Sequence, residues 1–153
     1  MIKIEKSIVI EGPVEEVFAY ASDLVHAREY FTGVEKVSDV RSLPSGGYSF
    51  KSVNKVDGLH TEMTSEDVAF VRNERMVARA RGALDEMLLT ATFERLEGGK
   101  TQVTCIEEHT LQGGILGKLG EPFFAKYLDH AAELTQASLK ACIETGVPAE
   151  AVG

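Results

Sequence analysis

The sequence has few cysteines and prolines, and it lacks tryptophan. Its 153 residues include two cysteines, four prolines and no tryptophan. Cys105 and Cys142 match no zinc-binding or redox spacing, so we expect free thiols in a reducing compartment. No apolar run approaches the roughly 18 residues that a membrane-spanning helix needs. The charged, alternating start MIKIEKSIVI is not typical of a signal peptide. Together these absences predict a cytoplasmic protein without an integral membrane segment.

Positive charge is also scarce. The chain has 24 acidic residues against 16 lysines and arginines, a net charge of −8. Such a balance argues against a nucleic-acid duplex or an anionic membrane as the main partner. The one basic cluster consists of Arg72, Arg75, Arg79 and Arg81. Its spacing fits a solvated strand face better than an anion site.

Catalytic and cofactor motifs are missing as well. The sequence has no nucleophile elbow, phosphate-binding loop, zinc-protease motif or dinucleotide fingerprint. The four histidines, at positions 26, 60, 109 and 130, have no metal-binding spacing. We therefore expect no metal and no cofactor. The sequence leaves the oligomeric state open.

The length and the 44% hydrophobic content fit one ordinary domain over residues 1–153, with a frayed tail from about residue 147. Residues 2–11 alternate like a strand, with only Lys6 interrupting a row of isoleucines. Pro13 then suits the first position of a short helix. Asp23 is a candidate N-cap for a second short helix that ends near Gly33.

The middle of the chain, from Val34 to Leu111, is predicted to form six antiparallel strands. Five turn signals divide it, at 44–47, 56–58, 72–74, 82–86 and 97–100. The glycine-rich stretch QGGILGKLGEP is expected to act as a flexible gate or a bend. A final amphipathic helix is expected from about Glu121 to Thr145, ended by Gly146 and Pro148.

This order predicts an α+β fold: a seven-stranded curved antiparallel sheet that grips a long C-terminal helix, with two short helices after the first strand. The sheet must bury one face against another element. One helix cannot fill a curved sheet of this size, so room is left between them. Concave, mostly apolar spaces with a few polar groups are where small molecules bind.

Two stretches of the chain resemble a known family. The opening KSIVIEGPVEEVFAYASDLVHAREYFTGVEKV and the later GGKTQVTCIEEHTLQGGILGKLGEPFF are similar to the START-like superfamily, also called SRPBCC, in its polyketide cyclase/dehydrase and lipid-transport branch. The resemblance covers about residues 2–145 and implies the helix-grip fold. The family's opening often carries tryptophan near positions 28–31, where this chain has REYF. The superfamily includes lipid carriers, aromatic-polyketide cyclases, hormone receptors and quinone-binding proteins, and fold alone does not choose among them.

Glu107 and His109 are the candidate catalytic residues. They lie two apart in VTCIEEHTL, so they share a strand face with Val103, Cys105 and Leu111, which similarity to the family places inward. On that face they could orient or protonate a carbonyl-bearing ligand. The alternative is a β-bulge near Glu107 that would turn both side chains to solvent.

Other side chains are candidates for lining the cavity. Tyrosines offer an apolar body with a polar tip, and methionines suit a pocket that adapts to its ligand. Tyr30 and Phe31 could form the mouth. The full ligand-binding set is Tyr48, Phe50, Met63, Cys105, Phe124, Tyr127, Tyr30 and Phe31, with Met76 and Met87 as further methionines on other strands. Ordinary core is the commoner role for tyrosines and methionines of this kind, and Tyr30 and Phe31 could instead hold the second short helix against the sheet.

Three functions follow from this layout. The first is binding of a small hydrophobic or amphipathic ligand, such as a lipid, a quinone, a polyketide-like aromatic or an isoprenoid. The second is a cyclase or dehydratase that uses Glu107 and His109 as an acid/base pair. The third is a stress-response or toxin-type module that docks on other proteins. The sequence leaves open whether the protein is an enzyme.

Overall fold

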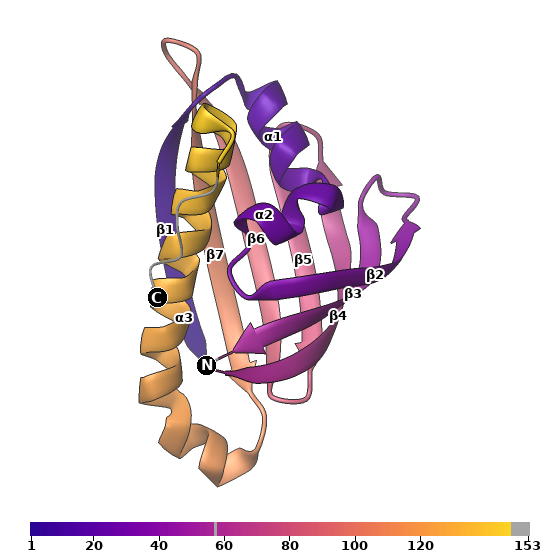
Figure 1. Ribbon diagram of the computed structural model, residues 1–153, viewed down its shortest axis with the longest axis vertical. Coiled ribbons are helices and arrows are strands. Elements are labelled where there is room, and N and C mark those ends of the chain that lie inside the picture. Colours follow the sequence, from indigo (N-terminus) through magenta and orange to yellow (C-terminus); the bar gives the residue numbers. More distant parts are fainter. Residues whose placement is uncertain (57, 148–153) are drawn as a thin grey trace.

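One antiparallel sheet of seven strands curves around a long helix (Figure 1). The structure is a computed structural model that describes residues 1–56 and 58–147. The strand order is β1-β7-β6-β5-β4-β3-β2, so the chain's first strand pairs with its last. The strands are β1 (Ile2–Glu11), β2 (Val34–Ser42), β3 (Tyr48–Val56), β4 (Leu59–Val71), β5 (Arg75–Gly82), β6 (Asp85–Leu96) and β7 (Lys100–Leu111). The predicted fold class is therefore confirmed.

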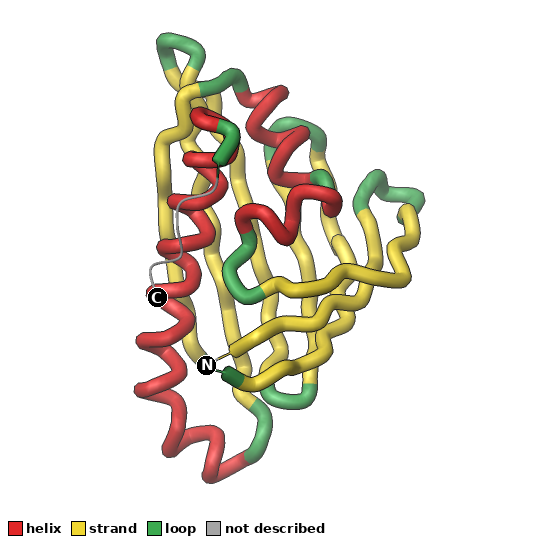
Figure 2. Tube along the Cα trace, in the orientation of Figure 1, coloured by secondary structure: helices red, strands yellow, loops and turns green. Residues whose placement is uncertain are grey.

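The curvature has a local cause in the outer strands. Strand β2 shifts register twice against β3, between Val34 and Lys36 and between Ser38 and Arg41. Strand β4 shifts against β5 between Asp67 and Ala69. Bulges of this kind bend a strand and increase its twist. They turn β2, β3 and β4 across the open side of the sheet, as the trace in Figure 2 shows.

The inner strands, in contrast, pair regularly. Both ladders of β7, with β1 and with β6, run without a register shift. Glu107 therefore lies opposite Ile4 of β1, and His109 lies opposite Ile2. Both isoleucines are buried. The bulge that would have turned Glu107 and His109 outward does not occur in β7.

Two short helical segments close one end of the sheet (Figure 1). Helix α1 (Val14–Ser22) begins directly after Pro13, which occupies its N-cap. Asp23 caps the 3₁₀ turn η1 (Leu24–His26) by accepting a hydrogen bond from the backbone N–H of Val25, and helix α2 (Ala27–Tyr30) follows. Sequence reasoning predicts this order, with one continuous second helix in place of η1 and α2.

The close-packed core lies under that closed end. The ring of Phe18 on α1 contacts Phe70 and Phe93 edge-on, with ring centroids 5.3 and 5.1 Å apart. Edge-to-face pairs add to the free energy gained by burial alone. The buried residues of this cluster are Ile10, Val14, Val17, Phe18, Tyr30, Ala91, Phe93, Val103, Leu139 and Cys142. The core therefore fills only the part of the concave face nearest α1 and α2.

The final helix, α3 (Gly114–Thr145), starts earlier than expected. The prediction that it begins near Glu121 is wrong. Of the glycine-rich stretch, which is expected from the sequence to be a flexible gate or a bend, only Gln112 and Gly113 form a bend, and the rest is helical. Gly113 has a φ of 106°, which lets the chain leave β7 and enter the helix at once. Pro122 lies inside the helix, where it removes a backbone hydrogen bond and favours a kink. Figure 1 shows this first part of α3 extending beyond the sheet.

The helix ends as predicted. Gly146 adopts a left-handed φ of 78°, and its N–H donates to the carbonyl of Cys142 at 2.9 Å. Pro148 and the tail that is expected to fray lie outside the described residues. Within the part of the chain that is described, no helix combines the length and the hydropathy needed to cross a bilayer.

Candidate functional site

A cavity of about 180 Å³ lies between the sheet and α3. It occupies the end of the concave face that the core leaves unfilled. A cavity of roughly 150 Å³ is enough to hold one benzene ring, so this one accepts a molecule of that order without rearrangement. Its apolar lining is formed by Ala21, Phe31, Met63, Met76, Met87, Leu89, Ala91, Phe93, Val103, Leu128, Ala131, Ala132 and Leu139.

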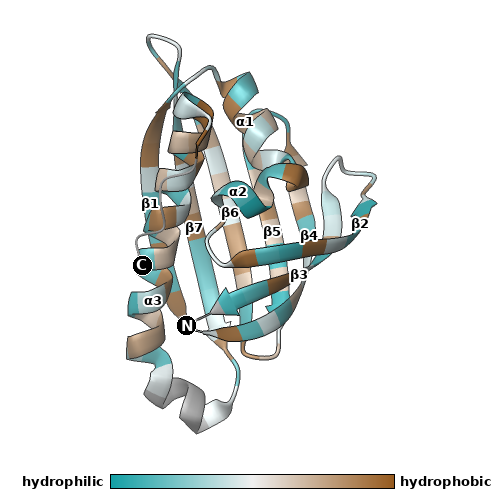
Figure 3. Ribbon diagram, in the orientation of Figure 1, coloured by the Kyte–Doolittle hydropathy of each residue, from teal (hydrophilic) through white to brown (hydrophobic). Residues whose placement is uncertain are grey.

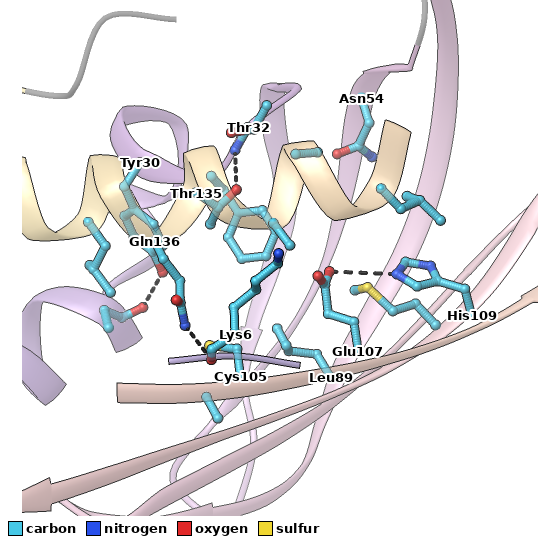
Figure 4. Close-up of a pocket in the computed structure, with 18 of the residues that line it drawn as sticks. Lys6, Tyr30, Thr32, Asn54, Leu89, Cys105, Glu107, His109, Thr135 and Gln136 are labelled. Carbon is cyan, nitrogen blue, oxygen red and sulfur yellow. Dashed lines mark hydrogen bonds and ion pairs between the residues drawn. The ribbon is translucent and has the colours of Figure 1, made fainter. Parts of the chain in front are cut away.

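Three ionisable side chains from neighbouring strands meet in the wall of this cavity. The imidazole Nδ1 of His109 lies 2.6 Å from a carboxylate oxygen of Asp85, and its Nε2 lies 3.6 Å from an oxygen of Glu107. Figure 4 shows Glu107 and His109 pointing toward one another from β7. The β6–β7 register brings Asp85 to them, because Met87 lies opposite His109 and Asp85 opposite Leu111. We call Asp85, Glu107 and His109 the polar triad.

The polar triad is buried. Only 3% of the His109 side chain and 14% of each carboxylate side chain is exposed. Figure 3 shows the corresponding part of β7 as a hydrophilic stretch. Burial by itself lowers the pKa of His109, but the hydrogen bond to Asp85 and the nearby Glu107 outweigh it. They raise the pKa of His109 to about 9, so the imidazole is protonated at neutral pH.

Two buried atoms of the polar triad have no hydrogen-bond partner among the described residues. They are Nε2 of His109 and Oδ1 of Asp85, and both are buried. Buried polar atoms without a partner are rare and costly. A protonated ring carries a hydrogen on Nε2, so the triad has one open donor and one open acceptor without a described partner.

A second polar group lines the cavity from β1 and α3. The ammonium group of Lys6 reaches across to α3, where it lies 3.0 Å from a carboxylate oxygen of Asp129. The Gln136 amide donates to the Lys6 carbonyl at 2.8 Å. Burial raises the pKa of the Cys105 thiol to about 11, although Gln136 opposes the shift, so this cavity cysteine is a neutral thiol.

The segment after α2 and the end of β3 meet α3 beside the cavity. The backbone N–H of Thr32 donates to the Thr135 hydroxyl at 3.0 Å. The Tyr127 hydroxyl donates to the carbonyl of Lys55 at 3.4 Å, a long hydrogen bond. Asn54, Lys55, Thr32 and Thr135 all belong to the cavity wall. Two hydrogen bonds thus link α3 to this side of the cavity wall.

The sequence matches one family model along almost its whole length. The model describes polyketide cyclase / dehydrase and lipid transport proteins, and it matches residues 1–144. The chain belongs to this family. A search of the curated proteins gives no match.

Solved structures of similar proteins agree on the fold. A protein from Thermus thermophilus, TTHA0849, superposes with a TM-score of 0.82 at 20% identity, covering 94% of this chain and 98% of its own. The Zhui aromatase/cyclase from Streptomyces sp. R1128 superposes with a TM-score of 0.68 at 13% identity, covering 96% of this chain and 98% of its own. A START superfamily protein from Mycobacterium smegmatis superposes with a TM-score of 0.67 at 11% identity, covering 87% of this chain and 95% of its own. At these identities the likeness shows the helix-grip fold of the family and leaves the ligand open.

The structure brings seven of the ten candidate catalytic and ligand-binding residues into one cavity, together with the further methionines Met76 and Met87. The seven are Tyr30, Phe31, Met63, Cys105, Glu107, His109 and Tyr127. The hydroxyl of Tyr30 is already used, because it donates to the Ala21 carbonyl at 2.5 Å, and burial raises its pKa.

The other three residues, Tyr48, Phe50 and Phe124, are not among the described residues of the cavity wall. Tyr48 and Phe50 lie at the start of β3, next to Asp67 and away from the end that meets α3. Phe124 lies on α3 before Tyr127, and the centroids of the two rings are 6.2 Å apart. Its position near the start of α3 carries it past the cavity.

Sequence reasoning misses Asp85 and Lys6. The turn signal at 82–86 includes Asp85, yet this residue is the first of β6. The sequence could nevertheless have revealed Asp85. If the two strands flanking the turn at 97–99 are paired residue by residue, Met87 lies opposite His109, and Asp85, two residues before Met87, lies on the same face of the sheet. Lys6 interrupts an apolar strand face in the sequence pattern, but a long side chain on that face can cross the cavity.

Proposed function

We propose that this protein binds a small hydrophobic or amphipathic ligand in the cavity between the sheet and α3. The observation that carries the proposal is a cavity with apolar walls and one polar corner, the polar triad. Such a site binds the body of a ligand by burial and fixes its orientation with a few polar contacts. Membership in a family of cyclases, dehydrases and lipid-transport proteins supports it.

The volume narrows the range of ligands. Pockets for drug-sized molecules occupy roughly 300–1,000 Å³, more than the 180 Å³ of this cavity. A monocyclic aromatic, a simple quinone or a short isoprenoid therefore fits best. A long-chain lipid exceeds this volume. Each Å² of apolar surface buried contributes roughly 25 cal/mol to binding.

Native mass spectrometry of the freshly purified protein tests the proposal. We expect a noncovalent adduct of low mass that disappears on denaturation. The matched control is Ala131→Phe, which puts a ring into the cavity from α3. If the adduct persists unchanged in this variant, the ligand binds elsewhere and the proposal fails.

A second candidate function is acid/base catalysis in the same cavity, supported by the polar triad. The protonated His109 would donate a hydrogen bond to a ligand carbonyl, and the Glu107 carboxylate would take a proton from the adjacent carbon. Asp85 would hold the imidazole in position. The variants Glu107→Gln and His109→Gln separate the two functions. Loss of turnover with retained affinity supports catalysis, whereas a change in affinity alone supports binding.

A further inference from the structure

The polar triad contains information about the chemistry of the ligand. His109 uses Nδ1 on Asp85, and its Nε2 lies 3.6 Å from Glu107, beyond a hydrogen bond. Two atoms at that separation can share one neighbour lying about 2.8 Å from each. The neighbour must accept a hydrogen bond from Nε2, and it also satisfies the Glu107 carboxylate if it donates a hydrogen bond to it.

The charges around this position favour a neutral group. At neutral pH the triad holds two carboxylates and one imidazolium, a net charge of −1. The described cavity wall also holds two lysines. Asp129 offsets the charge of Lys6 at 3.0 Å, and Lys55 is exposed to solvent, which screens its charge. A ligand carboxylate would accept from Nε2 but would stand close to two like charges in a buried site.

Other ligand groups leave Nε2 of His109 or the carboxylates without a hydrogen-bond partner. A ketone or ether oxygen accepts from Nε2 but has nothing to donate to Glu107 or to the open oxygen of Asp85. An ammonium group donates to the carboxylates but leaves Nε2 facing another donor. A hydroxyl both accepts and donates, and it is neutral. It alone among these groups meets the open donor and an acceptor together.

We propose that the cavity selects a neutral ligand that carries a hydroxyl group on an apolar body about the size of one aromatic ring, with the hydroxyl held between His109 and Glu107. The inference rests on the proposed ligand-binding function and adds the ligand's chemical class. Phenols and short alcohols of this size meet it. The hydroxyl accepts from Nε2 of His109 and donates to Glu107, while the ring lies among Met63, Met87 and Leu89.

Isothermal titration at pH 7 with four probes of eight carbons tests the inference. The probes are 4-ethylphenol, its isomer 4-methylanisole, acetophenone and 4-methylbenzoate. We expect 4-ethylphenol to bind at least about tenfold more tightly than each of the others, because one hydrogen bond to a charged group is worth about that factor. In Glu107→Gln we expect its advantage over 4-methylbenzoate to shrink several-fold, since one repelling charge is gone.

The matched control is Glu108→Gln, the next residue on β7, which is not among the described residues of the cavity wall. It should leave all four affinities unchanged. If the four probes bind alike, or 4-methylbenzoate binds best, and Ala131→Phe abolishes this binding, the cavity is a ligand site but hydroxyl selection is wrong. If none of the probes binds up to its solubility limit, the proposed function for ligands of this size fails, and this inference fails with it.

Discussion

His109 lies between two carboxylates, and its proton is the residue-scale feature with the most direct consequences. A buried imidazole would ordinarily be neutral, because burial disfavours the charged form. Here Asp85 and Glu107 reverse that preference. Asp85 makes the shorter contact, 2.6 Å against 3.6 Å, so it is the partner that matters most.

Replacing Asp85 should therefore neutralise the histidine. In Asp85→Asn we expect the pKa of His109 to fall from about 9 toward or below its usual 6.5. An NMR titration of the histidine ring signals measures this shift. The control is Glu86→Gln, whose parent side chain pairs instead with Arg81 at 3.0 Å. An unchanged pKa of His109 in Asp85→Asn would contradict the assigned role of Asp85.

The same proton makes stability depend on pH. The pKa of His109 is raised in the folded state, about 9 against 6.5. Its contribution is complete below pH 6.5 and is lost as the pH rises toward 9. The free energy of unfolding should then drop by on the order of 3 kcal/mol across that window. Urea unfolding of the native chain and of His109→Gln checks this, and the variant should lack this part of the drop. Parallel profiles for the two proteins would show that His109 does not titrate as described.

At this scale the sequence predicts part of the site. Simple alternation along β7 puts Glu107 and His109 on one face with Val103 and Cys105, with a β-bulge as the alternative, and the ladders on both sides of β7 contain no such bulge. Alternation within one strand cannot reveal Asp85, because it belongs to another strand and depends on the β6–β7 register. The functional roles of these residues stay predictions.

At the scale of elements, α3 differs most from expectation. Glycines and a proline argue against a helix before Glu121, and local propensity alone supports that reading. The left-handed turn at Gly113 lets the helix begin at Gly114, directly after β7. The strands and most turns follow their local signals. Asn73, for example, adopts a left-handed φ of 64° in the β4–β5 turn, as asparagine tolerates.

The extended α3 makes Gly120 a helical residue with open space around it. Apart from its chain neighbours and the adjacent helix backbone, a Cβ built there meets no described atom within 4 Å. Gly120→Ala should stabilise the protein by roughly 0.5–1 kcal/mol, because glycine is the poorer helix former. Thermal and urea unfolding measure the gain. A loss of stability would place Gly120 outside a regular helix and contradict the early start of α3.

Gly47, in the β2–β3 hairpin, has no room for a side chain. A Cβ at Gly47 would lie 2.5 Å from Asp67, which accepts a hydrogen bond from the Tyr48 N–H at 2.8 Å. Gly47→Ala should cost about 1–3 kcal/mol of unfolding free energy as Asp67 is displaced. The control is Gly12→Ala, where the nearest atoms are at an ordinary 3.5 Å. Equal effects of the two substitutions would contradict this close contact.

At the scale of the whole molecule, the concave face is divided between a core and a cavity. The three aromatic rings of Phe18, Phe70 and Phe93 fill the end under α1. At the other end, α3 contributes the small side chains of Ala131 and Ala132 to the cavity wall, together with the ring of Tyr127. The sequence indicates that one helix cannot fill the sheet, but the volume left over depends on how side chains from every element meet. Only the structure gives the value.

The central claim is that this cavity receives a small apolar ligand, and the methionines can report it directly. The chain has four: Met63, Met76 and Met87 line the cavity, whereas Met1 is 76% exposed. With ¹³C-labelled methionine methyl groups, a titration with 4-ethylphenol should shift the three cavity signals along one saturating curve and leave Met1 unmoved. Signals that stay fixed, or a Met1 signal that moves with the others, would contradict the account.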